Sequence, residues 1–114
     1  MQNYTPLKWD WTPVVTGDTY PGINITCDGP DSDLARVRID IKAAGSTAVA
    51  LGLDSDTNGV TINDATAWDF TIDSINPVNL APGVFYYDLE TTDAAGTIRT
   101  EFNGSWQIIK EATI

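Results

Sequence analysis

The sequence contains no histidine and a single cysteine among its 114 residues. General acid–base and nucleophilic catalysis at neutral pH usually depend on His, on an activated Cys or Lys, or on two carboxylates in a pocket. The carboxylate pairs that share a strand face, Asp69 with Asp73 and Asp88 with Glu90, lie on faces that the residue alternation predicts to be solvent-exposed. We therefore predict that the protein is not an enzyme and needs no cofactor.

Cys27 has no second cysteine with which to form an intrachain disulfide. It follows Ile23 and Ile25 at alternate positions, so we expect a buried thiol on a strand. A reactive thiolate would need a basic neighbour, and the chain offers no histidine for that role.

Basic residues are scarce: six Lys and Arg stand against sixteen Asp and Glu, which gives a formal charge of −10. Nucleic acids and anionic lipids attract clusters of Lys and Arg, so we expect neither a nucleic-acid nor a membrane partner. No stretch approaches the ~18 apolar residues of a membrane-spanning helix. The start of the chain, Met1 to Trp9, lacks the apolar core of a secretory signal, and we expect synthesis in a cytoplasm without a signal peptide.

Helical periodicity of apolar residues is absent, whereas apolar and polar residues alternate between clusters of Gly, Pro, Asn and Asp. The clearest alternation, over 35–42, places Val37, Ile39 and Ile41 on one face. Further strands are expected at 23–27, 49–53, 60–62, 68–72, 85–90 and 97–109, with a brief helical turn at 75–80 and a bulge or kink at 103–104. Seven to eight short, mostly antiparallel strands indicate a two-sheet sandwich or a small barrel, and we predict an all-β, immunoglobulin-like β-sandwich.

We divide the chain into an N-terminal aromatic segment, 1–16, and one immunoglobulin-like β-sandwich domain, 17–114. Trp68 and Trp106 fit the alternation of the core. The aromatic residues of the N-terminal segment lie outside that alternation, so they either cover one end of the domain or belong to an interface arm that docks against another subunit. The interface candidates are Tyr4, Trp9 and Trp11.

The segment Asp54-Ser55-Asp56-Thr57-Asn58-Gly59 matches the first half of a calcium-binding loop, with Asp54, Asp56 and Asn58 as weak candidate ligands. The second half fails, because Ala65 occupies the position of the bidentate Glu. Asp, Asn and Gly are also the residues of tight turns, so we predict a plain turn and no metal.

The C-terminal half has a distinctive cadence. It begins with the segment Leu80-Ala81-Pro82-Gly83-Val84-Phe85-Tyr86-Tyr87-Asp88-Leu89-Glu90. A turn at Gly96 follows, then the segment Gly104-Ser105-Trp106-Gln107-Ile108, and the pattern ends with Glu111-Ala112-Thr113. Together with Gly17-Asp18-Thr19, this cadence resembles the small immunoglobulin-like domain of bacteriophage tail and baseplate proteins, and it is similar to the N-terminal domain of baseplate upper proteins. The resemblance extends from about residue 17 to the end of the chain.

The resemblance implies a non-enzymatic virion structural protein that assembles or connects tail, neck or baseplate components. Its partners would be other virion structural proteins in symmetric multiple copies, and its location the virion. Two alternatives stay open: a head-decoration (cement) protein on a capsid, and a carbohydrate-binding or adhesin module. For an assembly role, the segment 47–53, rich in Ala and Gly, is a candidate edge strand for close approach by a partner.

Overall fold

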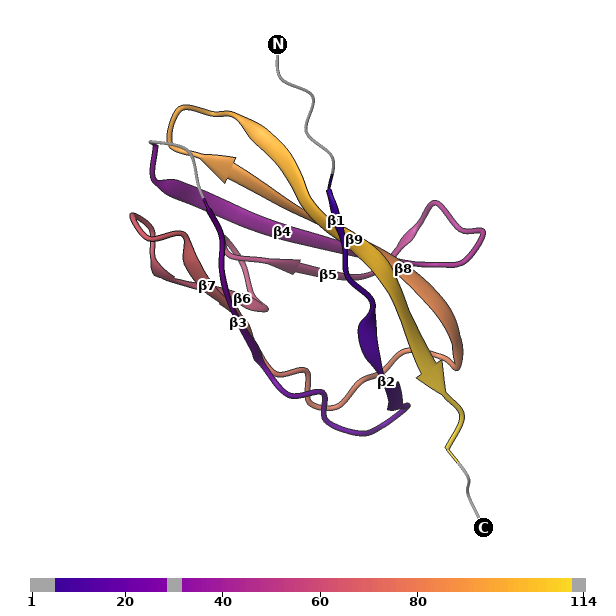
Figure 1. The fold of residues 1–114 in the computed structure, drawn as a ribbon. Helices are drawn as coiled ribbons and strands as arrows, with labels where there is room; N and C mark the ends of the chain where they lie inside the picture. The colour runs from indigo at the N-terminus through magenta and orange to yellow at the C-terminus, as the bar shows by residue number, and fades with distance from the viewer. Residues whose placement is uncertain (1–5, 29–31, 112–114) are drawn as a thin grey trace.

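The computed structural model describes residues 6–28 and 32–111, whose strands form two sheets packed face to face (Figure 1). The strands are β1 (Leu7–Lys8), β2 (Trp11–Val15), β3 (Ile23–Thr26), β4 (Leu34–Ala43), β5 (Val49–Asp54), β6 (Val60–Asp64), β7 (Asp69–Ile72), β8 (Gly83–Asp93) and β9 (Ile98–Ile109). The large sheet has the order β1-β9-β8-β4-β5, with β2 also paired to β9, and the small sheet has the order β3-β7-β6.

The core lies between the two sheets because strands of both sheets turn alternate apolar residues inward. Val37, Ile39 and Ile41 of β4 are fully buried, as their alternation predicted, and Phe70 of β7 is buried opposite them in the same cluster. The all-β, immunoglobulin-like sandwich predicted from the sequence is thereby confirmed. The described residues contain nine strands in place of the expected seven to eight, because β1 and β2 were not foreseen.

The hairpin of β8 and β9 forms the middle of the large sheet. Its turn is held by Asp93, whose carboxylate accepts hydrogen bonds from the backbone N–H groups of Ala95 and Thr97, both at 2.9 Å. The register of the hairpin shifts between Leu89 and Glu90. The bulge expected at residues 103–104 is therefore wrong, since the β8 and β9 ladder runs through them without a shift.

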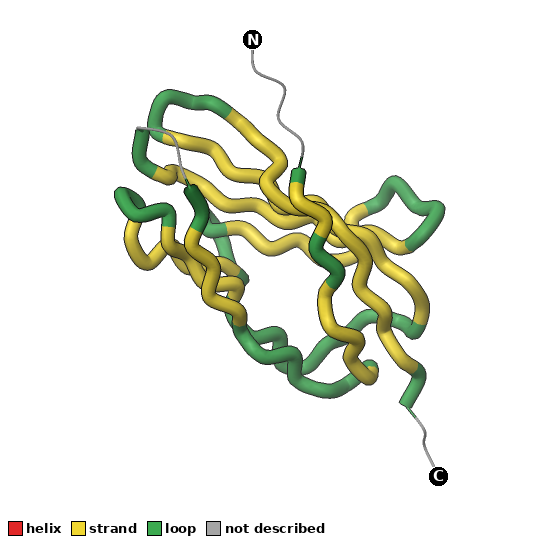
Figure 2. The backbone as a smooth tube through the Cα atoms, in the orientation of Figure 1, coloured by secondary structure: helices red, strands yellow, loops and turns green. Residues whose placement is uncertain are grey.

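Two connections, 16–22 and 73–82, pass between the sheets at one end of the molecule (Figure 2). They pair with each other through Tyr20 and Ile75, whose backbone groups exchange hydrogen bonds of 2.8 and 2.9 Å. The helical turn expected at 75–80 is wrong: Ile75 bridges to Tyr20, the chain bends at Asn76 and Pro77, and Val78 and Leu80 are buried at this end of the core. The long-range pairing with Tyr20 satisfies backbone groups that a local helical turn would otherwise pair.

The first strands lie on the large sheet, where β1 and β2 both pair with β9 in parallel. Their register places Lys8 opposite Asn103 and Trp11 opposite Trp106. Residues 6–16 are thus part of the sandwich, which begins before residue 17. Among the described residues, no helix is long and apolar enough to cross a membrane.

Candidate functional site

The outer face of the large sheet is the surface that turns away from the small sheet, and β8 runs through its centre. Phe85, Tyr87 and Leu89 of β8 point into the core, so the intervening residues point outward. Among these, Tyr86 keeps 55% of its surface exposed although its strand has neighbours on both sides. Val84 of the same strand is 43% accessible, so exposed apolar side chains gather on this face.

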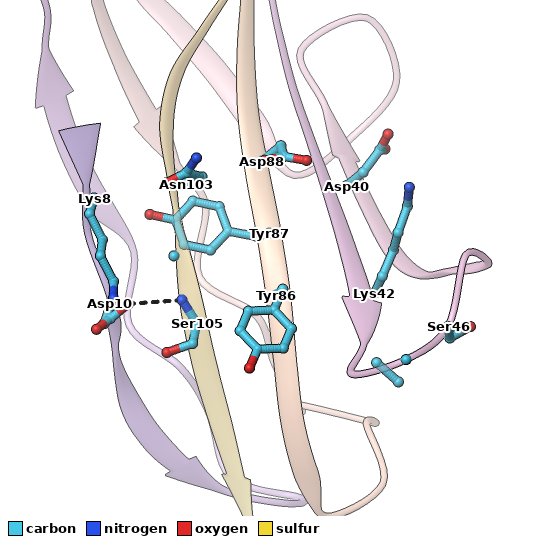
Figure 3. Close-up of a pocket in the computed structure, with 13 residues that line it drawn as sticks. Lys8, Asp10, Asp40, Lys42, Ser46, Tyr86, Tyr87, Asp88, Asn103 and Ser105 are labelled. Carbon is cyan, nitrogen blue, oxygen red and sulfur yellow. Dashed lines mark hydrogen bonds between the residues drawn. The ribbon is translucent and has the colours of Figure 1, made fainter. Parts of the chain in front are cut away.

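Tyr86 lines a hollow of about 530 Å³, which we call the Tyr86 hollow (Figure 3). Its walls come from four segments that are distant in the sequence: β1 and the residues after it, β4 with the turn that follows, β8, and β9. In the close-up, Tyr86 lies between Ser105 on one side and Lys42 on the other. The charged side chains that line the hollow are Lys8, Asp10, Asp40, Lys42 and Asp88.

One wall of the Tyr86 hollow is fixed by contacts between the N-terminal segment and β9. Asp10 accepts a hydrogen bond of 2.9 Å from the backbone N–H of Ser105, and this bond is the main reason that the pKa of Asp10 lies below its ordinary value. Trp9 donates its backbone N–H to the carbonyl of Asn103 at 2.8 Å. Gly104 permits this close approach, because a Cβ there would lie 2.1 Å from the carbonyl oxygen of Trp9.

A second hollow of about 450 Å³ lies on the same face above β4 and β5, and we call it the Gly52 hollow. Arg36 forms a bidentate pair with Asp54, with N···O distances of 3.1 and 2.5 Å, and Arg38 lies 3.2 Å from Asp40. The hydrogen bonds from Arg36 hold the pKa of Asp54 below its ordinary value, so the carboxylate stays ionised at neutral pH. Asp40 lines both hollows and connects them.

The charges of the chain are distributed unevenly between this face and the rest of the molecule. Four of the six basic residues line the two hollows, together with four acidic residues, so the formal net charge of the two linings is zero. The remainder of the sequence carries two basic and twelve acidic residues, which is the whole of the −10 charge. The basic residues are Lys8, Arg36, Arg38 and Lys42, and the acidic ones are Asp10, Asp40, Asp54 and Asp88. The linings of the two hollows are therefore neutral on an acidic protein, and Glu90, which lies outward on β8 opposite Arg38, adds one negative charge to this face.

The outer face of the small sheet differs in both charge and shape. Asn24 donates to Asp69 at 2.7 Å, Asn63 donates to Thr71 at 2.8 Å, and Thr61 donates to Asp73 at 3.0 Å. These side chains satisfy one another, and the carboxylates among them have no basic neighbour on β3, β6 or β7. The pair of Asp69 and Asp73 thus belongs to a hydrogen-bonded surface ladder.

Two of the three interface candidates of the N-terminal segment, Trp9 and Trp11, pack on their own domain. Trp11 is 3% exposed, and its ring lies 4.7 Å from that of Tyr87 and 5.1 Å from that of Trp106. Trp9 is partly buried against the core, and its ring lies 5.7 Å from that of Phe102. Both tryptophans therefore cover their own domain, which is the first of the two alternatives that the sequence left open. Tyr4 lies outside the described residues.

The candidate calcium loop is a turn between β5 and β6. Its first carboxylate, Asp54, is engaged by Arg36 and by the backbone N–H of Asp56, and Arg36 also reaches Asp56 at 3.4 Å. A guanidinium thus occupies the position at which a cation would have to bind Asp54. Within 6–28 and 32–111, no group of three or more His, Cys, Asp or Glu side chains is placed to hold a metal ion.

Further buried polar groups lie on β8 and β9 of the large sheet, near Trp68, which precedes β7 of the small sheet. Glu101 is 4% exposed, accepts a hydrogen bond of 2.8 Å from Thr91, and pairs with Arg99 at 2.9 Å. The guanidinium of Arg99 lies 5.4 Å from the ring of Trp68, a cation–π contact.

Cys27, just beyond β3, is only partly buried, yet burial is the main cause that raises the pKa of its thiol to about 11. The thiol is consequently protonated at neutral pH.

These observations define the class of the molecule as an all-β sandwich domain whose conspicuous surface is a hollowed, charge-balanced sheet face. No protein-family model matches the chain, and no curated protein matches it. Among solved structures, the chain is similar in fold to CopC from Methylosinus trichosporium OB3b, with a TM-score of 0.52 and 11% sequence identity. The match covers 88% of this chain and 86% of that one, so it supports the sandwich over nearly the whole sequence.

The structural match also corrects the function expected from the sequence. The phage resemblance predicted a virion structural protein, whereas CopC is among the solved proteins that share this fold. The prediction of a tail, neck or baseplate role is wrong on this finding. The cadence of residues 80–108 has a simpler origin, since a proline–glycine turn followed by an alternating aromatic strand is what the β8 and β9 hairpin itself requires.

Proposed function

We propose that this sandwich is a non-catalytic assembly domain, in which a second copy of the chain docks on the outer face of the large sheet. The observation that carries the proposal is the exposed ring of Tyr86 in the wall of a hollow whose lining also carries charges of both signs. An aromatic anchor inside a polar rim is the arrangement that concentrates binding energy in protein interfaces. Val84 on the same strand adds a second exposed apolar side chain, 43% accessible.

The distribution of charge favours a second copy of the chain as the partner that binds the outer face of the large sheet. Two molecules that each carry −10 repel one another at long range, and the repulsion is least where the surface is neutral. An isologous contact also needs a self-complementary surface, with positive groups that meet negative groups of the same patch. The outer face supplies both: Lys8 and Lys42 form no ion pair among the described residues, and Asp10 and Asp88 are available on the same rim.

The dimensions of the molecule allow such a contact. Its principal extents are 53 × 27 × 20 Å. The area of its broadest side is therefore larger than the ~800 Å² that each partner buries in a stable interface. The outer face of the small sheet is a poorer candidate, because it offers carboxylates and amides without a basic residue.

The non-catalytic part of the proposal follows from the groups that could react. The thiol of Cys27 is protonated at neutral pH, and Asp69 and Asp73 lie on an open sheet face where they accept hydrogen bonds from neighbours. General acid–base chemistry needs a titrating group within a site that excludes water, and neither group meets that requirement.

Sedimentation velocity over a wide range of protein concentration tests the proposal. The wild-type chain should form a dimer, and Tyr86→Ala should weaken it by roughly tenfold or more, since a central aromatic anchor is lost. Leu7→Ala is the matched control, because Leu7 is also an exposed apolar residue, 63% accessible, but does not line either hollow. A monomer at every concentration, or equal weakening by both substitutions, would overturn the proposal.

A further inference from the structure

We infer that the Gly52 hollow is the receptor for Tyr86 of the second copy, so that each copy inserts its tyrosine beside the other's Gly52. This inference rests on the proposed docking of two copies and specifies the contact that holds them together. It begins with a glycine that this chain does not need for its own fold.

Gly52 lies in the middle of β5 without a conformational or packing reason within the chain. The glycines at 17, 45, 59, 83 and 96 have positive φ angles, and Gly22 and Gly104 face backbone atoms 3.1 and 2.1 Å from an added Cβ. A Cβ on Gly52 would meet only Val49 Cγ1, at an ordinary 3.8 Å. Among the glycines of the described residues, Gly52 alone is under neither constraint.

A glycine inside a strand destabilises it, since it loses more conformational entropy on folding than other residues and offers no side chain to pack. Such a position marks a bulge, a bend or a close approach by another molecule, and the bulge nearest to Gly52 lies between Val49 and Leu51 and not at Gly52 itself. The Gly52 hollow lies directly above it on the outer face, with the half-exposed Val49 as its apolar wall. The missing side chain therefore leaves room for a group that comes from outside the chain.

The lining of the Gly52 hollow suits a tyrosine. Arg36 and Arg38 both line it, and each is held by a carboxylate, Asp54 and Asp40 respectively. A guanidinium that is fixed by an ion pair presents its flat face for stacking on an aromatic ring. The same carboxylates retain lone pairs that accept a hydrogen bond from a phenolic hydroxyl.

Symmetry makes the contact reciprocal. Tyr86 pairs with Lys42, and Gly52 pairs with Asp40, so the two positions lie on opposite sides of β4 and are displaced along it. Asp40 lines both hollows, and a two-fold axis passing close to it exchanges Tyr86 of one copy with Gly52 of the other. The two Asp40 carboxylates that approach this axis are neutralised by Arg38, 3.2 Å from Asp40 within each copy.

Filling the hollow provides the first test. Gly52→Val adds a β-branched side chain that suits a strand and meets no backbone, so the variant should fold. It should weaken the dimer by roughly tenfold or more in sedimentation velocity, because the valine occupies the place of the incoming ring. Thr26→Val is the control, since it places the same side chain on the outer face of the small sheet. Unchanged dimerisation of Gly52→Val would overturn the inference.

A cross-linking experiment provides a positive readout that does not depend on loss of affinity. In a Cys27→Ala background, a chain with Tyr86→Cys is mixed with a chain with Gly52→Cys under mild oxidation. Disulfide formation requires Cα atoms within about 7 Å, so a rapid heterodimeric disulfide in the mixture, exceeding either variant alone, is the expected result.

The two tests separate the inference from the proposal on which it rests. If wild type dimerises, Tyr86→Ala dissolves the dimer, and the mixed cysteine variants do not cross-link, docking on the outer face stands but its contact is not the Gly52 hollow. If wild type stays monomeric at every concentration, the proposed function itself fails and the inference falls with it.

Discussion

The phenolic hydroxyl of Tyr87 donates a hydrogen bond of 2.5 Å to the backbone carbonyl of Trp9, a residue 78 positions earlier in the chain. This bond joins the N-terminal segment to the middle of the large sheet, and it holds in place the wall that carries Lys8 and Asp10. Burial is the main cause that raises the pKa of Tyr87 above its ordinary value, so the hydroxyl remains a donor throughout the neutral and mildly alkaline range. The architecture of the Tyr86 hollow thus depends on the residue next to Tyr86.

Tyr87→Phe should destabilise the fold by about 1–3 kcal/mol, because the substitution leaves the carbonyl of Trp9 without this donor in a partly buried place. Tyr86→Phe is the matched control: it removes the hydroxyl of the exposed neighbour and should change stability by less than about 0.5 kcal/mol. Urea unfolding followed by tryptophan fluorescence measures both. Equal effects would show that the Tyr87 hydroxyl does not anchor the N-terminal segment.

Gly104→Ala should destabilise the fold by about 1–3 kcal/mol, because its Cβ would lie 2.1 Å from the carbonyl oxygen of Trp9 and the segment would have to move away. Gly52→Ala should have the opposite sign, a gain of about 0.4–1 kcal/mol, since nothing obstructs its Cβ and the unfolded chain loses entropy. Thermal unfolding of the two variants and wild type tests the pair. A Gly104→Ala variant as stable as wild type would contradict the close approach of Trp9.

Replacing Glu101 by Gln should cost about 3 kcal/mol, because the change removes the buried charge that faces Arg99 while keeping the shape of the side chain. Asp40→Asn is the comparison, since the Arg38–Asp40 pair is exposed and should contribute at most about 1 kcal/mol. Chemical denaturation of both variants checks the difference. If the two substitutions cost the same, burial of the Arg99–Glu101 pair on β9 does not make it more stabilising than an exposed pair.

Stability should fall as pH rises from about 9 to about 11, partly because of Cys27. Its folded pKa is raised from 9.0 to about 11, so over this range the folded thiol keeps a proton that the unfolded thiol has lost. The stabilisation is complete below pH 9 and disappears as pH rises through the folded pKa. Cys27→Ala should therefore show a shallower decline across this window. Parallel stability curves for Cys27→Ala and wild type would refute the buried-thiol contribution.

The sequence predicted the parts of the fold that depend on local alternation. Val37, Ile39 and Ile41 were placed in the core by their period of two, and Asp88 was placed on the exposed side of its strand by the same rule. The alternation failed for β1 and β2, which are short, contain Pro13, and gain their order from parallel pairing with β9. The helical turn at 75–80 failed for the same kind of reason, since its partner Tyr20 is far away in the sequence.

The candidate site was harder to foresee, because its walls come from segments at residues 8–10, 40–46, 86–88 and 103–105. The acidic composition was visible in the sequence, but the gathering of four of the six basic residues on one face depends on the order of strands in the sheet. Trp9 and Trp11 attracted attention as aromatics outside the core alternation, whereas the ring contacts that bury Trp11 arise only in three dimensions. The signal that pointed to the face was the outward tyrosine.

The most direct test of docking on the outer face is a dilution series of the isotope-labelled protein followed by NMR. We predict that backbone signals of Tyr86, Asp88 and Ser105 on the outer face of the large sheet shift with concentration, while those of Asn24, Asn63 and Thr71 on the small sheet stay constant. Spectra that are independent of concentration, or shifts confined to the small sheet, would contradict the account.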